Sequence, residues 1–258
     1  MSGSLSDWTG SNQGIAAIGF VVGILGIGNG YPGQPHVVNR LMALKDIESL
    51  KQARIIAISW AFLVYLGMLL LGWSARILIP NVGDGETVFF AVTQLLFDPL
   101  IAGVVIAAVL SAVMSTADSQ ILVVSSSIAH DNQQRHISVA RQLLMSRLAV
   151  VAVCIAAVLL AINVNDSIFN RVLFAWHAVG SAFGPVLIVR LLGRQMSNAT
   201  VLASMMSGFG LTILLNSQPN LPGDFAERWL PFLVALSFAA INSHKKSSQN
   251  QPGENSES

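Results

Sequence analysis

The sequence predicts an all-α membrane protein with about seven transmembrane helices, the first of which is broken at its middle. Of the 258 residues, 53% are hydrophobic and only 10% are charged, whereas soluble domains carry about 25% charged residues. The mean hydropathy is +0.63. The apolar runs are long and uninterrupted rather than alternating, which favours membrane-spanning helices over the strands of a barrel.

The break in the first helix is predicted by residues 26–36, which read Gly-Ile-Gly-Asn-Gly-Tyr-Pro-Gly-Gln-Pro-His. Each proline lacks a backbone donor and each glycine costs conformational entropy, so this stretch cannot continue a regular helix. The apolar residues 15–25 are too few to cross about 30 Å of hydrocarbon alone. Such breaks at membrane depth mark binding sites in transporters. The alternative is a loop between two short soluble helices.

Six further apolar spans follow, at 55–75, 99–129, 143–162, 168–192, 199–215 and 225–241. The charged residues 45–54 are expected to form a loop, and a short amphipathic helix is expected within 81–98. The chain should therefore comprise a polar N-terminal segment over 1–13, a membrane core over 14–216, a last membrane helix within 217–242 and a disordered polar tail over 243–258.

The distribution of basic residues predicts the orientation in the membrane. Seven spans place the two termini on opposite sides. With the N-terminus outside, eleven of the fourteen basic residues lie at cytoplasmic ends of spans, and only Arg76, Arg171 and Arg228 lie outside. Because cytoplasmic loops carry an excess of Lys and Arg, we expect the N-terminus outside and the C-terminus in the cytoplasm.

Small and hydroxyl-bearing residues share one face of the span at 99–129. Ala112, Ser115, Thr116 and Ser119 are spaced at i, i+3, i+4 and i+7, which brings them to the same side of a helix. Ser115 and Thr116 lie near the middle of the span, where hydroxyls and backbone carbonyls could bind a sodium ion. The alternative is that the hydroxyls bond to carbonyls four residues earlier or to a neighbouring helix.

A carboxylate inside a membrane span is rare, and one lies in the span at 99–129. Asp118 lies two residues to the cytoplasmic side of Thr116 and, with Ser119, is a candidate for the path by which sodium enters. Asp118 could equally pair with a loop arginine such as Arg135 or Arg141. We expect His177, in the span at 168–192, to be a core residue rather than a ligand.

The two half-helix ends at the break have opposite polarity. Orphan carbonyls near residues 26–28 favour a cationic group, and free N–H groups after Pro35 favour an anionic one. Tyr31 lies between them, so a small zwitterionic solute would suit the break. The sequence shows no metal-ligand cluster, phosphate loop, nucleophile elbow or basic–aromatic stripe, and we therefore expect neither an enzyme nor a nucleic-acid-binding protein.

Three motifs resemble those of the sodium:solute symporter family. Gly-Tyr-Pro-Gly-Gln-Pro-His at 30–36, followed by Arg40, resembles the family's broken helix. Ala-Val-Met-Ser-Thr at 112–116 resembles its sodium-site helix. Phe-Ala-Trp at 174–176 and Gly-Ser-Ala-Phe-Gly-Pro at 180–185 resemble a later core helix. The resemblance covers residues 14–215, and within the family it points to the bacterial sodium/proline symporters.

The resemblance implies a fold of two inverted five-helix repeats, of which this chain holds the second. It implies sodium-coupled symport of proline or a related amino acid across the cell (inner) membrane, with sodium as coupling ion and no other cofactor. It implies that the Ala112 carbonyl and the hydroxyls of Ser115 and Thr116 bind sodium. Ile27, Tyr31 and Pro35 would then line the solute site. In the proline carriers a tryptophan stands at the position of Ile27, which is a departure.

The resemblance also predicts that the chain is incomplete, since only the second repeat is present. We expect a fragment, a split-gene half or a truncated product. Its partners would be sodium, the solute, the lipid bilayer and the missing N-terminal half of the carrier. The competing interpretations are a membrane sensor or interaction module that does not transport, and an inactive remnant.

Overall fold

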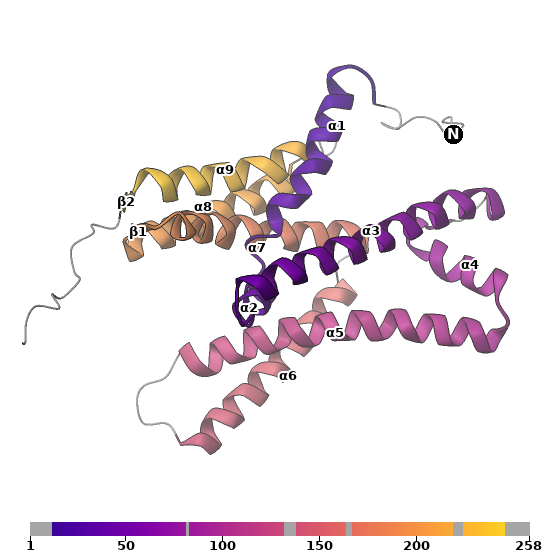
Figure 1. The fold of residues 1–258 in the computed structure, drawn as a ribbon, viewed down its shortest axis with the longest axis horizontal. Coiled ribbons are helices and arrows are strands. Elements are labelled where there is room, and N and C mark those ends of the chain that lie inside the picture. Colours follow the sequence, from indigo (N-terminus) through magenta and orange to yellow (C-terminus); the bar gives the residue numbers. More distant parts are fainter. Residues whose placement is uncertain (1–11, 81–82, 132–137, 164–166, 219–223, 246–258) are drawn as a thin grey trace, which may run out of the picture. The chain divides into compact units, whose positions relative to one another are not determined.

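The computed structural model describes residues 12–80, 83–131, 138–163, 167–218 and 224–245. In this part of the chain the elements are helices, apart from two short strands (Figure 1). The residues form two compact units. The terminal unit joins Met1–Gln34 to Arg171–Ser258, and the middle unit is Pro35–Asn170.

The middle unit is built from membrane-length helices and two short α-helices. Its elements are α2 (Pro35–Met42), α3 (Ile47–Leu78), the 3-10 turn η2 (Gly85–Thr87), α4 (Val88–Leu96), α5 (Pro99–Asp131) and α6 (Val139–Asn163). Helices α5 and α6 pack against each other, α4 contacts both α3 and α5, and α2 contacts α5. Helix α4 is the amphipathic helix expected within 81–98.

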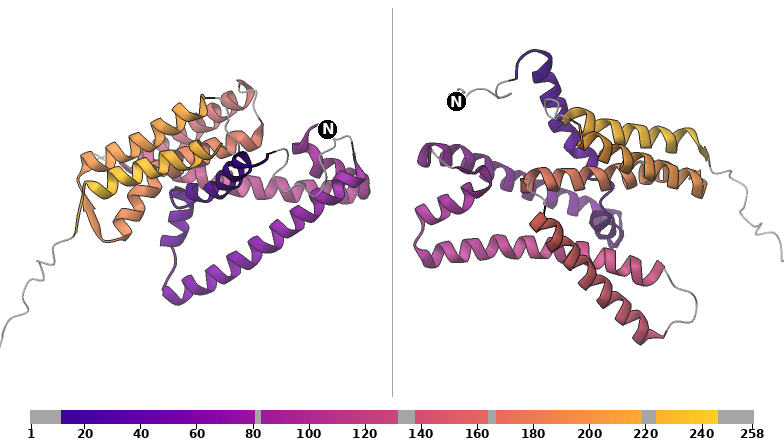
Figure 2. Two further views of the ribbon diagram at one scale, coloured as in Figure 1. Left: turned by 90° about the horizontal axis from the view of Figure 1, so that it is seen from above. Right: turned by 180° about the vertical axis from the view of Figure 1, so that it is seen from behind.

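The terminal unit contains α1 (Ile15–Gly26), the 3-10 turn η1 (Ile27–Gly30), most of α7 (Ile168–Leu191), β1 (Arg194–Met196), α8 (Asn198–Asn216), α9 (Phe225–Ile241) and β2 (Ser243–Lys245). Helices α7, α8 and α9 lie side by side, and α1 crosses α9 (Figures 1 and 2). Strands β1 and β2 are antiparallel, with Gln195 opposite His244. Beside this ribbon, Val189, Met196 and Ala239 form a buried apolar cluster.

The predicted break is confirmed. Helix α1 ends at Gly26, one 3-10 turn follows as η1, and helical structure resumes only at Pro35. Among the described residues, five helices are long and apolar enough to cross a membrane, or six if the broken pair counts as one span. Helix α9 forms where the seventh span was expected. Its 17 residues give a length of about 26 Å, slightly less than the hydrocarbon core.

The expectation of a loop over 45–54 is wrong, because α3 already begins at Ile47. The Asp46 carboxylate caps this helix by accepting a hydrogen bond from the Ser49 backbone N–H at 2.7 Å, and the bonds from Ser49 lower the pKa of Asp46. Lys51 and Glu48 pair across the first turn at 3.1 Å. Capping and charge pairing thus extend the helix into a polar sequence where hydropathy gives no signal.

Two other boundaries also differ from expectation. Helix α6 begins at Val139 rather than at residue 143. The expected disordered tail is wrong for Ser243–Lys245, which forms β2 because its backbone pairs with β1. The remainder of that tail, and residues 1–11 of the expected N-terminal segment, lie outside the described residues.

Candidate functional site

The oxygen atoms proposed for sodium binding lie on α5, in the middle unit. Thr116 Oγ1 donates to the Ala112 carbonyl at 3.2 Å, and Ser119 Oγ donates to the Ser115 carbonyl at 3.0 Å. Ala112, Ser115 and Thr116 are all exposed. These i−4 bonds are those expected if the hydroxyls only satisfy the helix backbone. Two oxygens 3.2 Å apart can also both lie about 2.4 Å from one hard cation, so the same geometry suits an ion.

A hydrogen bond between α2 and α5 lies beside this face of α5. Arg40 Nη2 donates to Ser119 Oγ at 2.8 Å, so the Ser119 hydroxyl accepts from a guanidinium while donating to the Ser115 carbonyl. A positive charge at this distance is unfavourable for a sodium ion at Ser119 itself. The bond instead ties α2, which begins with Pro35, to the turn of α5 that carries Ser115.

Asp118 is exposed on α5. In the described part of the chain it forms no ion pair, and so none with Arg141. Arg135, the other loop arginine considered above, lies outside the described residues. An exposed carboxylate on a membrane-length helix calls for water, a cation or a protein partner.

In the terminal unit, the break packs against α7 through glycines. A Cβ atom on Gly180 would lie 2.7 Å from the carbonyl oxygen of Gly30, and one on Gly33 would lie 2.7 Å from the backbone nitrogen of Gly184. Gly33 and Gly180 face backbone atoms alone across this contact, whereas Gly30 faces the indole and carbonyl of Trp176, and Gly184 faces the Phe232 ring as well as the Gly33 backbone. Only residues without side chains allow this approach, which is why a break and a small-residue helix occur together.

Gln34 connects the break to α7 by hydrogen bonds. Its side chain is buried, at 5% exposed, and Nε2 donates to the carbonyls of Gly30 and Trp176, both at 3.0 Å. One amide therefore satisfies a carbonyl released by the break and a carbonyl of the packed helix. This fixes the backbone on either side of Tyr31.

The solute residues proposed from the resemblance fall into both units. In the terminal unit, Ile27 is half-buried and Tyr31 is 55% exposed. The Tyr31 ring pairs with Trp176 of α7, with centroids 5.9 Å apart and planes inclined by 51°. Two residues before Tyr31, Asn29 has a buried amide nitrogen with no hydrogen-bond partner among the described residues. Pro35, half-buried, begins α2 in the middle unit.

The core of the terminal unit contains buried polar side chains. His177 is 1% exposed, which confirms its core position. Its Nδ1 lies 2.7 Å from the Leu173 carbonyl, so Nδ1 carries a proton and donates it to that oxygen. Nε2 is buried without a hydrogen-bond partner in the described structure. Nearby on α9, Arg228 is 7% exposed and pairs with Asp224 at 3.2 Å.

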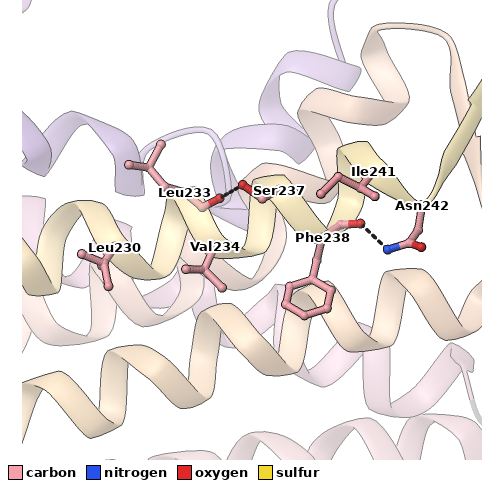
Figure 3. A pocket seen from close by; sticks show the side chains of 7 residues that line it. All are labelled: Leu230, Leu233, Val234, Ser237, Phe238, Ile241 and Asn242. Carbon is pink, nitrogen blue, oxygen red and sulfur yellow. Dashed lines mark hydrogen bonds between the residues drawn. The ribbon is translucent and has the colours of Figure 1, made fainter.

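A hollow along α9 does not resemble a site for a polar solute. Figure 3 shows that its lining side chains come from α9 and from Asn242, the residue that follows this helix. Its two polar groups are already bonded within the helix, Ser237 Oγ to the Leu233 carbonyl at 2.8 Å and Asn242 Nδ2 to the Phe238 carbonyl at 3.1 Å. An apolar surface of this kind suits lipid or another helix.

Sequence reasoning did not assign roles to Gln34, Arg40 and Trp176, although all three stand in the quoted motifs. Their contacts join residues 142 positions apart for Gln34 and 79 apart for Arg40. Such pairings depend on how the helices pack, which periodicity within one helix does not reveal. The motif letters were the only signal available for them.

The fold and these sites define a multi-pass α-helical membrane protein with a broken helix packed on a glycine-rich helix. A model of the sodium:solute symporter family matches residues 10–208. The chain therefore belongs to the sodium:solute symporter family.

Among the proteins to which the chain is similar are bacterial proline transporters. The chain is 36% identical over 208 residues to the osmoregulated proline transporter OpuE of Bacillus subtilis strain 168. The aligned region is 78% of this chain and 42% of that protein. It is 35% identical over 231 residues to the high-affinity proline transporter PutP of the same strain, and this region is 86% of this chain and 48% of that protein. It is 34% identical over 207 residues to a sodium/proline symporter of Staphylococcus aureus, covering 76% and 40%.

The chain thus spans less than half the length of these relatives. No solved structure matches it.

Proposed function

We propose that this chain is part of a sodium-coupled symporter that carries a small amino acid, with proline as the first candidate solute. The observation that carries the proposal is the similarity over at least three quarters of the chain to proteins described as proline transporters. The family is defined by sodium:solute symport, so sodium is the proposed coupling ion. In this role the chain is not an enzyme and needs no organic cofactor.

For sodium, we assign binding to the Ala112 carbonyl and the hydroxyls of Ser115 and Thr116. This assignment is supported by the position of the three residues on one face of α5 and by the 3.2 Å separation of the Ala112 and Thr116 oxygens. Binding would require the Thr116 hydroxyl to turn its hydrogen away from Ala112 and offer a lone pair. Asp118 and Ser119 remain candidates for the entry path, with Asp118 preferred because Arg40 occupies Ser119.

For the solute, we assign Ile27, Tyr31 and Pro35, which flank the break. Tyr31 combines an exposed ring with a position between two half-helix ends. The carbonyl end of the first half-helix and the N–H end of the second favour opposite charges, which is the charge pattern of an amino acid.

We propose that these sites are completed by helices corresponding to the remaining part of the relatives. Three oxygens from α5 are about half of what a hard cation needs. In the apolar stretch of α3 no residue is buried. In those of α5 and α6 only 6% of the residues are buried, whereas in that of α7 50% are buried. Lipid can cover apolar faces, but the hydroxyl face of α5 and the broken backbone need protein or water. Without those helices the chain should insert in a membrane and not transport.

We further propose that the N-terminus lies outside and the C-terminus in the cytoplasm. The pairing of β1 with β2 supports this, because it places both ends of the α8–α9 hairpin on one side. Arg194 and Lys245 stand in these strands, as the positive-inside rule requires of a cytoplasmic end. In a Cys154→Ser background, an impermeant thiol reagent applied outside should label Gln218→Cys and not His244→Cys. The reverse pattern would refute this orientation.

The proposed activity is tested by reconstitution in liposomes. Residues 1–258 are co-expressed with the N-terminal half of a related proline carrier, and labelled proline uptake is driven by an inward sodium gradient or, as control, a potassium gradient. The proposal predicts uptake that needs sodium and both parts. Properly inserted complexes that take up neither proline nor any competing amino acid would favour an inactive fragment or a non-transporting module. Sodium-driven uptake by the chain alone would overturn the claim that other helices are required.

A further inference from the structure

We propose that Trp176 of α7 is a further solute-contacting residue, and that its indole and the Tyr31 ring together form the aromatic wall that receives the ammonium group of the solute. The inference rests on the proposed function and deepens it, because it names a residue on a different helix and a chemical class of solute. That class is a small zwitterion with a compact secondary or quaternary ammonium.

The geometry of the two rings carries the first part of the argument. Their centroids are 5.9 Å apart and their planes are inclined by 51°, so the rings do not cover each other's faces as in a stack. Tyr31 keeps 55% of its surface exposed, although its neighbours Gly30 and Gly33 pack closely against α7. An inclined pair with an exposed ring can present both π faces to one small cation.

The position of Trp176 against the 3-10 turn η1 carries the second part of the argument. In a 3-10 turn, side chains at i and i+3 lie over each other, so Ile27 lies over Gly30. The indole of Trp176 covers Gly30 so closely that a Cβ there would overlap with it. Trp176 therefore lies on the side of η1 that Ile27 faces. Because position 27 is aliphatic in this chain, the indole supplies the aromatic surface on this side.

The wall is held in place by backbone contacts rather than by the two rings alone. Gln34 donates to the Trp176 carbonyl at 3.0 Å and to the Gly30 carbonyl at 3.0 Å. Gly33 and Gly180 allow the two backbones to touch on the other side of this bond. The backbone that carries both rings is therefore held in place before a cation arrives, and such preorganisation favours binding.

The solute class follows from the chemistry of the wall. Aromatic faces attract alkylated ammonium groups, which are weakly hydrated and present several polarised C–H and N–H bonds. They offer nothing comparable to a neutral ring oxygen. The wall should therefore distinguish proline from tetrahydrofuran-2-carboxylate, an analogue of the same shape in which oxygen replaces the ring ammonium.

The test uses Trp176→Ala and Trp176→Phe in the co-expressed carrier described above. The control is Trp229→Phe. Trp229 is a tryptophan of α9 that also packs on the broken helix and donates to the Val22 carbonyl at 2.8 Å, but it makes no ring pair with Tyr31 in the described structure. The readouts are the half-saturating proline concentration and the ratio of the inhibition constants of tetrahydrofuran-2-carboxylate and proline.

We expect Trp176→Ala to raise the half-saturating concentration about tenfold or more and to lower the selectivity ratio by a similar factor, with Trp176→Phe raising it about threefold. The Trp229→Phe control should change the amount of active carrier but not the ratio. If the Trp176→Ala carrier does not accumulate in the membrane, the selectivity ratio of the Trp176→Phe carrier decides the test. An unchanged ratio in the Trp176 variants of an active carrier would overturn this inference alone. Absence of sodium-driven uptake in the unmodified carrier would overturn the proposed function and this inference with it.

Discussion

Replacing Gly180 by alanine should force α7 away from the helix break. The new Cβ would lie 2.7 Å from the Gly30 carbonyl oxygen and 2.8 Å from its carbonyl carbon, and closer still to its Cα, whereas ordinary contacts begin at 3.4 Å. The obstacle is backbone on both sides, so no side chain can turn away to relieve it. Overpacking of this kind costs typically about 1–3 kcal/mol.

The matched control for this change is Gly210→Ala in α8, where a Cβ would meet nothing within 4 Å. Alanine is favoured over glycine in a helix by about 1 kcal/mol, so this variant should be as stable as the unmodified chain or more stable. Both variants are compared by thermal unfolding in detergent micelles, followed by circular dichroism. A lowered midpoint for Gly180→Ala with an equal or raised midpoint for Gly210→Ala is the expected result. Equal midpoints for all three proteins would show that the close approach of α7 to the break does not exist.

Two further variants test contacts that join distant parts of the chain. Gln34→Leu should destabilise the terminal unit by about 1–3 kcal/mol, because the buried Gly30 carbonyl loses the Gln34 donor and the Trp176 carbonyl loses its bond to the break; protection of the Tyr31 amide from hydrogen exchange should fall, and unchanged protection would contradict the bridging role. Glu86→Ala should destabilise the start of α7 by about 1–2 kcal/mol, since the carboxylate accepts from the backbone N–H groups of Ile168 at 3.0 Å and Phe169 at 2.8 Å. Glu86→Gln, which keeps one good acceptor, should lie between, and equal proteolysis of all three forms near residue 168 would refute the cap.

The membrane helices could be predicted from the sequence because the length of each apolar run indicates where a helix can cross the membrane. The break could be predicted because glycine and proline act locally on the backbone. The start of α3 could not, since Asp46 and Ser49 extend it by a cap into residues that hydropathy reads as a loop. Strands β1 and β2 could not, because three residues become a strand only when a distant partner pairs with them.

The candidate sites divide in the same way. Tyr31 and Thr116 stand in local motifs, so their place on a break and on a helix face follows from spacing. Trp176, Gln34 and Glu86 matter through contacts with residues far along the chain, for Glu86 some 82 positions away. Only the packing of the helices brings these side chains to the break and to the start of α7.

The most direct test of sodium coupling is the sodium concentration that gives half-maximal proline uptake in the co-expressed carrier. Thr116→Ala removes the hydroxyl that lies 3.2 Å from the Ala112 carbonyl, while Thr116→Ser retains it. We predict that Thr116→Ala raises this sodium concentration at least about tenfold, with the half-saturating proline concentration at saturating sodium nearly unchanged, and that Thr116→Ser stays close to the unmodified carrier. Equal sodium dependence in all three carriers would show that this hydroxyl only satisfies the helix backbone and would contradict the sodium site.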